Sequence, residues 1–419
     1  MEKVAIIGTG IAGVGCAHFL HKKYDLTIYE KNDYVGGHTN TITVDENGKE
    51  VYIDTGFMVF NHVTYPYLTK LFEDLKVPTK KTDMSFSVQH VPSGLEYCGS
   101  GLNGLFAQRK NLFSSKHIKM LMQIGRFNKE SLKTLDDPKY DDYSLEKYIK
   151  EEGYGEDMLW KYLIPMSSAV WSTPMDLMLE FPVKTLVRFF FNHGFLGLNT
   201  QHQWYTVVNG SRSYLDIIIA PFKERIEVNN AAIKVTRENG KVKVHTKDGS
   251  SKEFDKVIIA THGDEALKLL DKPSGEEARL LINFKYQKNT AILHTDERVM
   301  PKLISVWSSW NYRIEEKNNK LQPSTIYWMN SLQHLSKNKN YFVSINDPGN
   351  IDEKKIIKAI EYTHPLFDIS AIQAQKDLDK LNKTGHVYFC GSYFNYGFHE
   401  DALLSTVKLC NRLLNTNLY

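Results

Sequence analysis

The feature that most constrains this chain is a short apolar segment that runs directly into three closely spaced glycines near the N-terminus. Residues 4–7 are rich in β-branched side chains, and Gly8, Gly10 and Gly13 follow with the spacing G-x-G-x-x-G. The small and apolar residues at 14–20 suit a helix packed on a sheet. The pattern therefore predicts a strand, a glycine-rich turn and a helix.

Each glycine of this turn has a physical role in holding a diphosphate. Gly8 permits the tight turn, Gly10 lets the backbone approach a pyrophosphate, and Gly13 allows close packing of helix and strand. The amides that open the helix, those of Ile11 and Ala12 included, then face the phosphates. The turn therefore predicts a dinucleotide site.

An acidic residue after the next predicted strand strengthens this interpretation. Residues 26–29 read as a strand that ends in Glu30, 17 positions beyond Gly13 and near the spacing of the acid that binds the adenosine ribose 2′-OH. A carboxylate there disfavours a 2′-phosphate. The motif fits NAD and FAD equally, and the alternative for Glu30 alone is a surface acid that ends an ordinary strand.

A second pair of glycines follows the acid. After Lys31 the chain continues to Gly36 and Gly37, whose backbone can lie against a diphosphate, and then to His38 and Thr39. This segment resembles the extension that the flavin amine oxidase and phytoene desaturase superfamily places after its Rossmann motif, where it helps to hold FAD. The resemblance implies FAD as the cofactor.

The resemblance extends over essentially the whole chain. Further segments resemble, in order, a family of bacterial FAD-dependent proteins within that superfamily; they lie at residues 54–61, 84–88, 105–112, 171–174, 209–214 and 396–401. That family is linked with cyclopropane fatty-acyl phospholipid synthases, and related flavoproteins desaturate or isomerise lipid chains.

The expected fold is of the α/β class, with a Rossmann-like FAD-binding domain and an interleaved α+β substrate domain as in amine oxidases. We expect the FAD-binding domain at residues 1–80, 204–283 and 383–419, and the substrate domain at 81–203 and 284–382. The patterns agree, because strands and hairpins return after the first insert: they are predicted at 204–208, 232–236, 241–246 around Asn239-Gly240, 257–260 and 387–390.

The resemblance also implies which residues hold the cofactor. Ala232 marks the backbone beside the adenine, Ala260 and Thr261 run beside the cofactor, and the strand ending at Gly391 leads to a helix whose N-terminus faces the flavin. Ser392 replaces the usual acid, so the ribityl contact depends on this hydroxyl or on water. The predicted cofactor residues are Gly8, Gly10, Ile11, Ala12, Gly13, Glu30, Lys31, Gly36, Gly37, His38, Thr39, Gly56, Phe57, Ala232, Ala260, Thr261, Gly391, Ser392, Phe398 and His399.

Three neighbouring residues are the candidates for catalysis. Tyr396, His399 and Glu400 belong to the segment expected against the isoalloxazine ring, and His399 with Glu400 could move a proton near neutral pH. The alternative is that both cap a helix beginning near Asp401.

A second G-x-G-x-x-G at residues 99–104 lacks the context of a nucleotide site. The residues before it read as a hairpin around Pro92-Ser93-Gly94, and no acid follows at the expected distance. We therefore expect no second dinucleotide.

An amine substrate is disfavoured by two positions. Amine oxidases usually place two aromatic side chains as a cage at the flavin and a Lys on a strand near N5. Here only Phe398 aligns with a cage position, and the Lys position falls on Asn289 or Thr290, although a slip could restore Lys288. Aromatic residues of the inserts are instead candidates for an apolar cavity: Trp171, Phe181, Phe189, Phe190, Phe191, Phe195, Trp307, Trp310, Tyr327 and Trp328.

A basic segment gives some support to a lipid substrate. Residues 109–133 hold seven basic side chains and one acidic one, and Lys119, Gln123 and Arg126 recur at helical spacing opposite an apolar face. Such a helix could make peripheral contact with anionic lipid, and the alternative is the basic face of an ordinary helix.

Composition excludes several other classes of protein. The net charge of +3 argues against nucleic-acid binding driven by bulk charge. The four cysteines lie far apart without metal-ligand spacing, so we expect a reducing compartment and no metal. Polar residues interrupt every apolar stretch before the roughly 20 residues of a spanning helix. We expect a cytoplasmic protein, with a peripheral position on the inner face of the membrane as an option.

Taken together, these features predict an FAD-dependent oxidoreductase. The resemblance implies that it acts on an unsaturated or methyl-branched fatty-acyl chain, by hydride transfer to flavin N5 with desaturation or double-bond isomerisation. One alternative is a flavin amine oxidase that releases peroxide. Another is a flavin-binding accessory protein of a lipid-modifying enzyme, with a methyltransferase or cyclopropane synthase as partner.

Overall fold

A parallel sheet of five strands gathers segments from distant parts of the chain. The computed structural model describes residues 1–419 except 198, 199, 239 and 384. In the order β10-β2-β1-β14-β20, every neighbouring pair is parallel. The strands are β1 (Lys3–Ile7), β2 (Asp25–Tyr29), β10 (Ile226–Glu227), β14 (Lys256–Ile259) and β20 (Val387–Phe389).

The central strand of this sheet explains the apolar run at the start of the chain. Ile6 of β1 pairs with Ile28 on one side and with Ile258 on the other, and all three side chains are fully buried. A parallel sheet covered on both faces needs apolar residues at successive positions, so the run does not alternate. The predicted α/β fold with a Rossmann-like sheet is confirmed.

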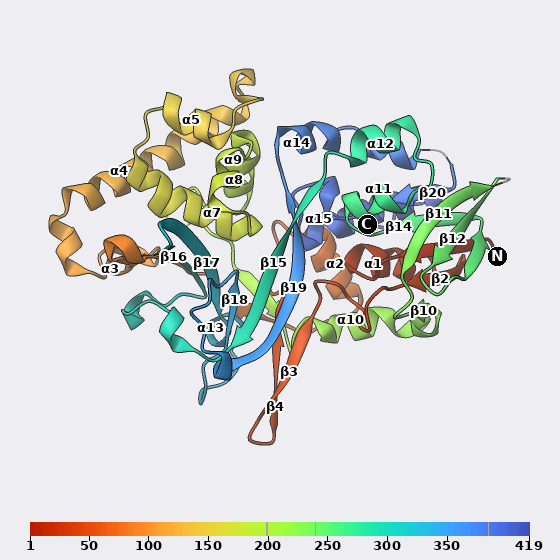
Figure 1. The fold of residues 1–419 in the computed structure, drawn as a ribbon, viewed down its shortest axis with the longest axis horizontal. Helices are drawn as coiled ribbons and strands as arrows, with labels where there is room; N and C mark the ends of the chain where they lie inside the picture. Colours follow the sequence, from red (N-terminus) through yellow and green to blue (C-terminus); the bar gives the residue numbers. More distant parts are fainter. Residues whose placement is uncertain (198–199, 239, 384) are drawn as a thin grey trace.

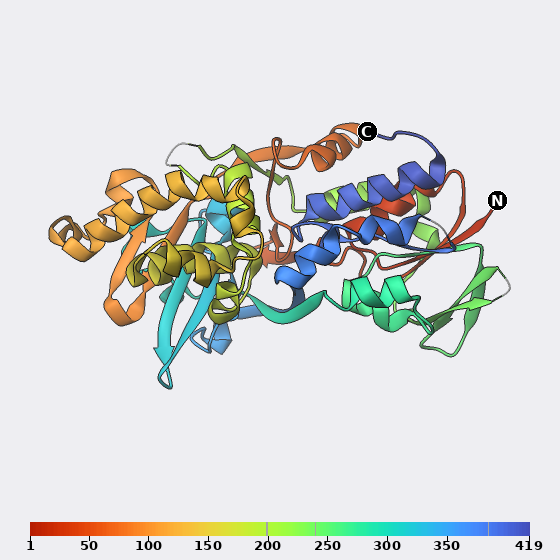
Figure 2. The same ribbon diagram turned by 90° about the horizontal axis from the view of Figure 1, so that it is seen from above.

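Helices cover one face of this sheet and a small antiparallel sheet covers the other (Figure 2). Thr406 of α15 donates a hydrogen bond to the carbonyl of Ala12 in α1, which joins the two helices. On the opposite face, Phe254 packs edge-on against Tyr29 of β2. The elements are α1 (Ile11–Leu20), α2 (Pro66–Asp74), α10 (Arg212–Ile219), α15 (His399–Leu414), β11 (Ala232–Glu238), β12 (Lys241–Thr246), β13 (Ser251–Phe254), α11 (Gly263–Leu269) and α12 (Gly275–Leu281). The predicted turn at Asn239-Gly240 includes Asn239, which lies outside the described residues.

A second, seven-stranded sheet has the order β19-β15-β18-β17-β16-β7-β8. Its strands are β7 (Phe86–His90), β8 (Leu95–Cys98), β15 (Lys285–His294), β16 (Trp310–Lys317), β17 (Lys320–Trp328), β18 (Phe342–Ile345) and β19 (Ile356–Leu366). Pairing is antiparallel except between β16 and β7. The long strands β15 and β19 run through the middle of the molecule (Figure 1).

The remaining elements surround the two sheets. Helices of the first insert lie beside the seven-stranded sheet (Figure 1): α3 (Gly101–Leu105), α4 (Ser115–Glu130), α5 (Leu145–Glu151), α6 (Glu156–Met158), α7 (Ile164–Trp171), α8 (Met175–Leu179) and α9 (Val183–Asn192). Two more helices, a hairpin and a small sheet complete the chain: α13 (Met329–Gln333), α14 (Ile369–Gln375), β3 (Thr41–Glu46), β4 (Lys49–Asp54), β5 (Phe60–Asn61), β6 (Thr79–Thr82) and β9 (Trp204–Val207).

The second G-x-G-x-x-G has a different setting from the first. It follows β8, which pairs antiparallel with β7, and it leads into the five-residue helix α3. Among the described residues, no helix combines the length and the apolar character that crossing a bilayer requires.

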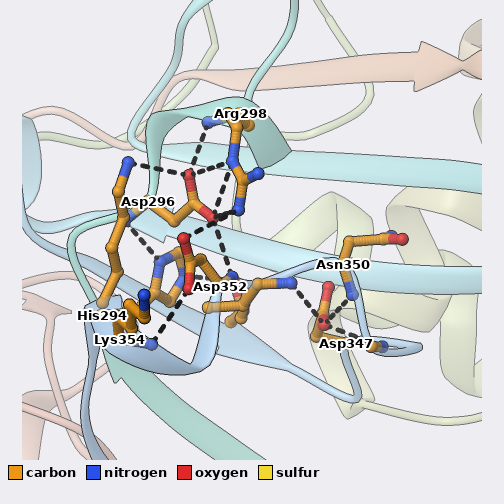
Figure 3. Close-up of polar contacts among 11 residues, drawn as sticks. His294, Asp296, Arg298, Asp347, Asn350, Asp352 and Lys354 are labelled. Atoms are coloured by element: carbon orange, nitrogen blue, oxygen red, sulfur yellow. Dashed lines mark hydrogen bonds and ion pairs between the residues drawn. The ribbon is translucent and has the colours of Figure 1, made fainter.

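A polar cluster closes the loops next to the C-terminal end of β15 (Figure 3). The carboxylate of Asp296 is fully buried and accepts hydrogen bonds from the Arg298 side chain at 2.9 Å and from the Asp352 backbone amide at 2.9 Å. Lys355 lies 3.3 Å from the same carboxylate. These bonds, led by those from Arg298, hold the pKa of Asp296 well below its ordinary value.

Candidate functional site

A cavity of about 970 Å³ opens at the carboxyl ends of the parallel strands. Its lining includes Gly8 after β1, Glu30 after β2, Ala260 after β14 and Gly391 after β20. This is the position where open α/β sheets bind ligands. The cavity continues to aromatic residues of the inserts, so its two ends differ in chemistry.

Most of the predicted cofactor residues line this cavity. They are Gly8, Gly10, Ile11, Ala12, Glu30, Lys31, Gly37, His38, Gly56, Phe57, Ala232, Ala260, Thr261, Gly391, Ser392, Phe398 and His399. The lining does not include Gly13, Gly36 or Thr39. Gly13 supports the turn instead, because a Cβ there would lie 1.9 Å from the carbonyl oxygen of Gly8.

The two glycine segments meet at the cavity wall. Gly8 has a φ of 101°, and a Cβ there would lie 2.8 Å from the carbonyl oxygen of Ala260. A Cβ on Gly37 would approach the Cα of Gly10 to 3.3 Å, whereas a Cβ on Gly10 would meet no protein atom within 4 Å. A side chain at Gly10 would therefore enter the space of a ligand and not the space of the protein.

The turn holds the Glu30 carboxylate beside the cavity. Glu30 is 5% exposed and accepts hydrogen bonds from the Thr9 amide at 3.2 Å and the Asn32 amide at 2.9 Å, and also from the Thr9 hydroxyl. Next to it, Lys31 pairs with Glu265 at 2.7 Å, and both residues line the cavity. The fixed carboxylate suits the ribose hydroxyl that the sequence pattern predicts.

Five lining residues have a buried polar atom with no hydrogen-bond partner among the described residues. These atoms are the Nε2 of His38, the hydroxyls of Tyr29 and Tyr393, and the indole nitrogens of Trp204 and Trp310. Buried polar groups are nearly always hydrogen-bonded in folded proteins. The unpaired atoms, the open space at Gly10 and the glycine backbone therefore fit a phosphate-containing cofactor such as FAD.

His399 stands at the first position of α15 with a fixed orientation. Its Nε2 lies 2.8 Å from the Tyr214 hydroxyl and 3.1 Å from the Thr39 hydroxyl, and its ring stacks on Phe57. Burial lowers the pKa of His399 to about 3, so the imidazole is neutral at physiological pH. It can share a proton with these hydroxyls but does not carry a fixed charge.

The structure separates Glu400 and Tyr396 from the cavity. The two oxygens of Glu400 accept hydrogen bonds from the amides of Tyr67 and Leu68, each at 2.9 Å, and thereby cap α2. Burial raises the pKa of Glu400 to about 7. Neither Glu400 nor Tyr396 is among the lining residues. Of the three predicted residues, the structure therefore brings only His399 to the cavity, and its catalytic role stays a prediction.

The capping alternative is also corrected. The amide of Phe398 donates to the carboxylate of Asp401 at 2.8 Å, so Asp401 caps α15. Glu400 caps a neighbouring helix instead, and Tyr396 accepts a hydrogen bond from the Trp171 indole through its carbonyl oxygen.

Aromatic side chains form the end of the cavity away from Glu30. Of the ten predicted residues, Trp171, Phe189, Phe195, Trp310 and Tyr327 line it. Phe189 links the groups, with ring centroids 4.7 Å from Trp171 and 5.1 Å from Phe398. The other five lie elsewhere: Phe181 and Phe190 are buried in the core, Phe191 is exposed, and Trp307 packs on Trp328.

Sequence reasoning missed other lining residues. Met58, Val59, Tyr65, Met84, Val170 and Trp204 also line the cavity. Met84 and Trp204 additionally line an open groove of about 520 Å³. These two side chains therefore stand between the cavity and the outside.

Two further histidines reach the cavity from distant segments. The ring of His38 lies 5.3 Å from that of His364 on β19 and 6.4 Å from that of His262 after β14. Burial lowers the pKa of all three, that of His364 to about 4. No motif marks His262 or His364 in the sequence, because strand pairing alone brings them to the site.

The structure shows the surroundings of the three residues on β15 where a Lys near flavin N5 was considered. Lys288 lines the cavity but is largely exposed and lies 3.8 Å from Glu361. Asn289 is buried, and its side-chain amide is 2.6 Å from Nδ1 of His364. Thr290, the other predicted position, is not among the lining residues.

Comparison with known proteins identifies a family whose model matches most of the chain. The family model described as flavin containing amine oxidoreductase matches residues 11–340. A 1-hydroxycarotenoid 3,4-desaturase from Flavobacterium sp. (strain P99-3) is 29% identical over 145 residues, which cover 32% of this chain and 28% of that enzyme.

Solved structures share the fold over nearly the full length. Putrescine oxidase bound to putrescine gives a TM-score of 0.69 at 12% identity, with 99% of both chains covered. A fatty acid isomerase from P. acnes that produces CLA gives 0.67 at 14% identity, with 98% of both chains covered. At these identities the likeness shows the fold alone.

Proposed function

The chain belongs to the flavin containing amine oxidoreductase family, and from this premise we propose that it oxidises or isomerises an unsaturated or methyl-branched fatty-acyl chain. The family establishes a flavin-dependent oxidoreductase with FAD as cofactor. The fatty-acyl substrate is our proposal, and it depends on the chemistry of the cavity.

The residues of the nucleotide end fit the cofactor. The amides of Ile11 and Ala12 at the start of α1 would hold the diphosphate, with Gly10 leaving room for it. Glu30 would accept from a ribose hydroxyl, and Ser392 lies in the lining where the ribityl chain is expected. When bound, FAD supplies a hydride acceptor.

The absence of charge at the aromatic end carries the substrate proposal. The lining residues that the structure describes between Met84 and Trp204 are uncharged: Met84, Val170, Trp171, Ser172, Phe189, Phe195 and Trp204. Trp310 and Tyr327 complete this wall. An ammonium group placed there would lose its hydration without a counter-charge, whereas an acyl chain gains from burial.

The protein's own proton chemistry centres on His399. Its Nε2, the Tyr214 hydroxyl and the Thr39 hydroxyl lie within hydrogen-bond distance of one another, so a proton can pass among them. With FAD as the hydride acceptor and the His399 group as the proton acceptor, loss of a hydride and a proton from adjacent carbons would leave a new double bond. An isomer would instead arise if a hydride left an allylic carbon and returned to the other end of the same allylic system, with no net oxidation.

The groove outside Met84 and Trp204 supplies a route for a long substrate. Its lining includes Lys81, Asp83 and His334, so it is polar where the cavity is apolar. We propose that an acyl chain passes between the two side chains with its polar end left in this groove.

Amine oxidation with release of peroxide is the second candidate. It is favoured by Glu361, a carboxylate in the lining that could attract an ammonium group. This candidate is weaker because Glu361 already lies near the Lys288 ammonium and is not part of the uncharged aromatic wall.

We also propose that the reaction occurs in the cytoplasm at the inner face of a membrane, where acyl chains are found. The resemblance noted above supports a lipid-modifying methyltransferase or a cyclopropane synthase as a functional partner. A purely accessory flavoprotein is the corresponding alternative.

Anaerobic spectra of the purified protein test these candidates. We expect the flavin absorbance to bleach with unsaturated or mid-chain methyl fatty acids and to remain with putrescine and cyclic amines. Product analysis by mass spectrometry detects an isomer if the acyl chain changes without bleaching. Bleaching by amines alone overturns the fatty-acyl proposal, and no change of flavin or lipid assigns an accessory role.

A further inference from the structure

An unusual group of apolar side chains faces solvent around α3 and α4. Phe113 is 91% exposed, Leu102 74%, Met122 72%, Leu112 45% and Ile118 40%. Single exposed apolar residues are common on soluble proteins. These five fall within residues 102–122, and we name this region of exposed side chains the α3–α4 surface. Groups of exposed apolar side chains are typical of interaction sites.

Hydrogen bonds fix the elements of this surface to one another. Nε2 of His117 in α4 lies 2.9 Å from the carbonyl oxygen of Leu105 in α3. The Ser114 hydroxyl accepts from the His117 amide and caps α4, and Arg109 donates to the carbonyl oxygen of Phe106. The apolar side chains therefore project from a structured base.

Both ribbon views place α3 and the start of α4 at the opposite end of the molecule from the N-terminus (Figures 1 and 2). The exposed side chains of α3 and α4 therefore belong to one end of the molecule. The side chain of Phe113 is almost fully exposed, as insertion into the interfacial layer of a lipid bilayer requires.

Helix α4 exposes apolar as well as basic side chains, which differs from the separate polar and apolar faces that its sequence predicts. Gln123 accepts a hydrogen bond from the Gly155 amide at 3.1 Å. The Arg126 guanidinium lies 4.0 Å from the centre of the Tyr154 ring and donates to a backbone carbonyl of residue 152. Gln123 and Arg126 of the predicted polar stripe thus pack against the protein, whereas Lys119 is exposed together with Ile118 and Met122.

The charge around these side chains is uniformly positive. Residues 97–129 contain no Asp or Glu. Within this segment the exposed basic side chains form no ion pair in the described part of the chain: they are Arg109, Lys110, Lys116, Lys119 and Lys129. Apolar anchors surrounded by unpaired cations match the interface of an anionic bilayer, with acyl chains below and phosphates above.

We propose that the α3–α4 surface docks the protein on anionic phospholipid bilayers, with Phe113, Met122 and Leu102 in the interfacial layer and the lysines at the phosphates. The docking surface goes beyond the proposed reaction, since it follows from exposure and charge alone. An acidic protein partner would pair with the basic side chains but would not bury the exposed apolar side chains, whereas a bilayer does both.

Vesicle sedimentation of the FAD-loaded full chain tests this surface. We expect binding to vesicles of phosphatidylcholine with 30% phosphatidylglycerol, little binding to pure phosphatidylcholine, and a decrease with added salt. The double variant Phe113→Ser with Met122→Ser should weaken binding about tenfold. The matched control is Ile282→Ser, which removes another exposed apolar side chain, 67% exposed and remote in sequence.

Charge is tested separately. Lys116→Glu with Lys119→Glu should abolish the preference for anionic vesicles, and Lys22→Glu with Lys23→Glu makes the same change of charge on the nucleotide-binding side as a control. The proposal would be overturned if both double variants lost vesicle binding equally, or if the wild type bound vesicles equally well with and without anionic lipid. A failure to bind either vesicle would also overturn it.

Folding and function are monitored independently of docking. Flavin content and thermal unfolding confirm that each variant is folded. Turnover of substrate dispersed in detergent should not change in the surface variants, so a docking failure cannot be confused with a wrong substrate.

Discussion

The imidazole of His399 lies face to face with the ring of Phe57, with centroids 3.9 Å apart and planes inclined by 10°. Phe57 belongs to the segment after β4, and His399 begins α15. This stacking and the bonds to Tyr214 and Thr39 give the ring one orientation beside the cavity. A neutral, oriented imidazole is suited to hydrogen bonding and proton sharing.

His399→Ala is expected to lower kcat by about 100-fold, in the range for removal of a group that handles a proton. Tyr214→Phe removes a partner of the imidazole and should cost about tenfold, mainly in kcat. Stopped-flow reduction measures both. Flavin retention must be unchanged for the effect to be chemical, and full turnover in His399→Ala would remove His399 from the mechanism.

The pH dependence of stability follows from the same residue. The folded-state pKa of His399 is about 3, below its ordinary value of 6.5, because burial disfavours the charged ring. Its contribution is complete above pH 6.5 and is lost as the pH falls toward 3, since the unfolded chain binds the proton first. Urea unfolding should show a lower free energy of unfolding at pH 5 than at pH 7 in the wild type. The difference between the two pH values should be smaller in His399→Asn.

Gly10→Val is expected to abolish flavin retention without unfolding the chain. The backbone at Gly10 has φ −61° and ψ 174°, which any residue adopts, and no protein atom would meet its Cβ. A side chain there fills the space of the diphosphate. Gly275→Val is the matched control, since its Cβ is equally free at the start of α12 and outside the cavity.

The absorbance ratio at 450 and 280 nm after gel filtration measures flavin retention. A Gly10→Val protein that keeps its full flavin content would contradict the assignment of the diphosphate site. A Gly275→Val protein that loses flavin would instead indicate a general effect on folding.

Glu400→Gln distinguishes a helix cap from a catalytic acid. The glutamine oxygen can accept one of the two amides that Glu400 accepts at the start of α2, so unfolding should become easier by about 1 kcal/mol. Turnover should stay within twofold. A 100-fold loss of kcat with normal stability would restore Glu400 to the catalytic group.

The pKa of Glu400 gives this variant a pH signature. Burial raises the pKa to about 7, above the ordinary 4.5, so the stability linked to the protonated form is present below pH 4.5 and declines as the pH rises through 7. The decline should be seen in the wild type between pH 5 and pH 8. It should be smaller in Glu400→Gln.

Asp296→Asn is expected to destabilise the end of the seven-stranded sheet by about 2 kcal/mol, because its charged hydrogen bonds to Arg298 and to the Asp352 amide are weakened. The pKa of Asp296 is lowered, so its contribution is present above pH 4 and is lost at more acidic pH. Asp74→Asn breaks the exposed pair with Lys70 and should cost under about 0.5 kcal/mol. Thermal unfolding compares them.

The nucleotide end could be predicted from the sequence because its requirements are local. Gly8, Gly10 and Glu30 lie within two neighbouring strands and one turn, and each role is set by backbone geometry. A single strand–turn–helix unit therefore contained nearly all the information. The other strands of the parallel sheet lie far along the chain: the apolar runs at 257–260 and 387–390 predict β14 and β20, whereas no pattern predicts the two-residue strand β10.

The catalytic end could not be predicted as well, because it depends on helix phase and on distant pairing. Successive residues of α15 point about 100° apart, so a start at residue 399 directs His399 to the cavity and Glu400 to α2. His364 arrives through the pairing of β19 with β15. Gln123 is inward because Gly155 offers a donor, which no local pattern reveals.

Strands β15 and β19 carry a consequence for how substrate enters. They pair from Lys285 with Leu366 to His294 with Ile356, and one end holds Tyr286 against His262 while the other leads to the Asp296 cluster. Because this pairing is continuous along both strands, we expect the two ends of the ladder to move together. Entry of substrate past Met84 and Trp204, which line both the cavity and the outer groove, then needs only rotation of these two side chains, and we expect the width of the gap between them to select the substrate.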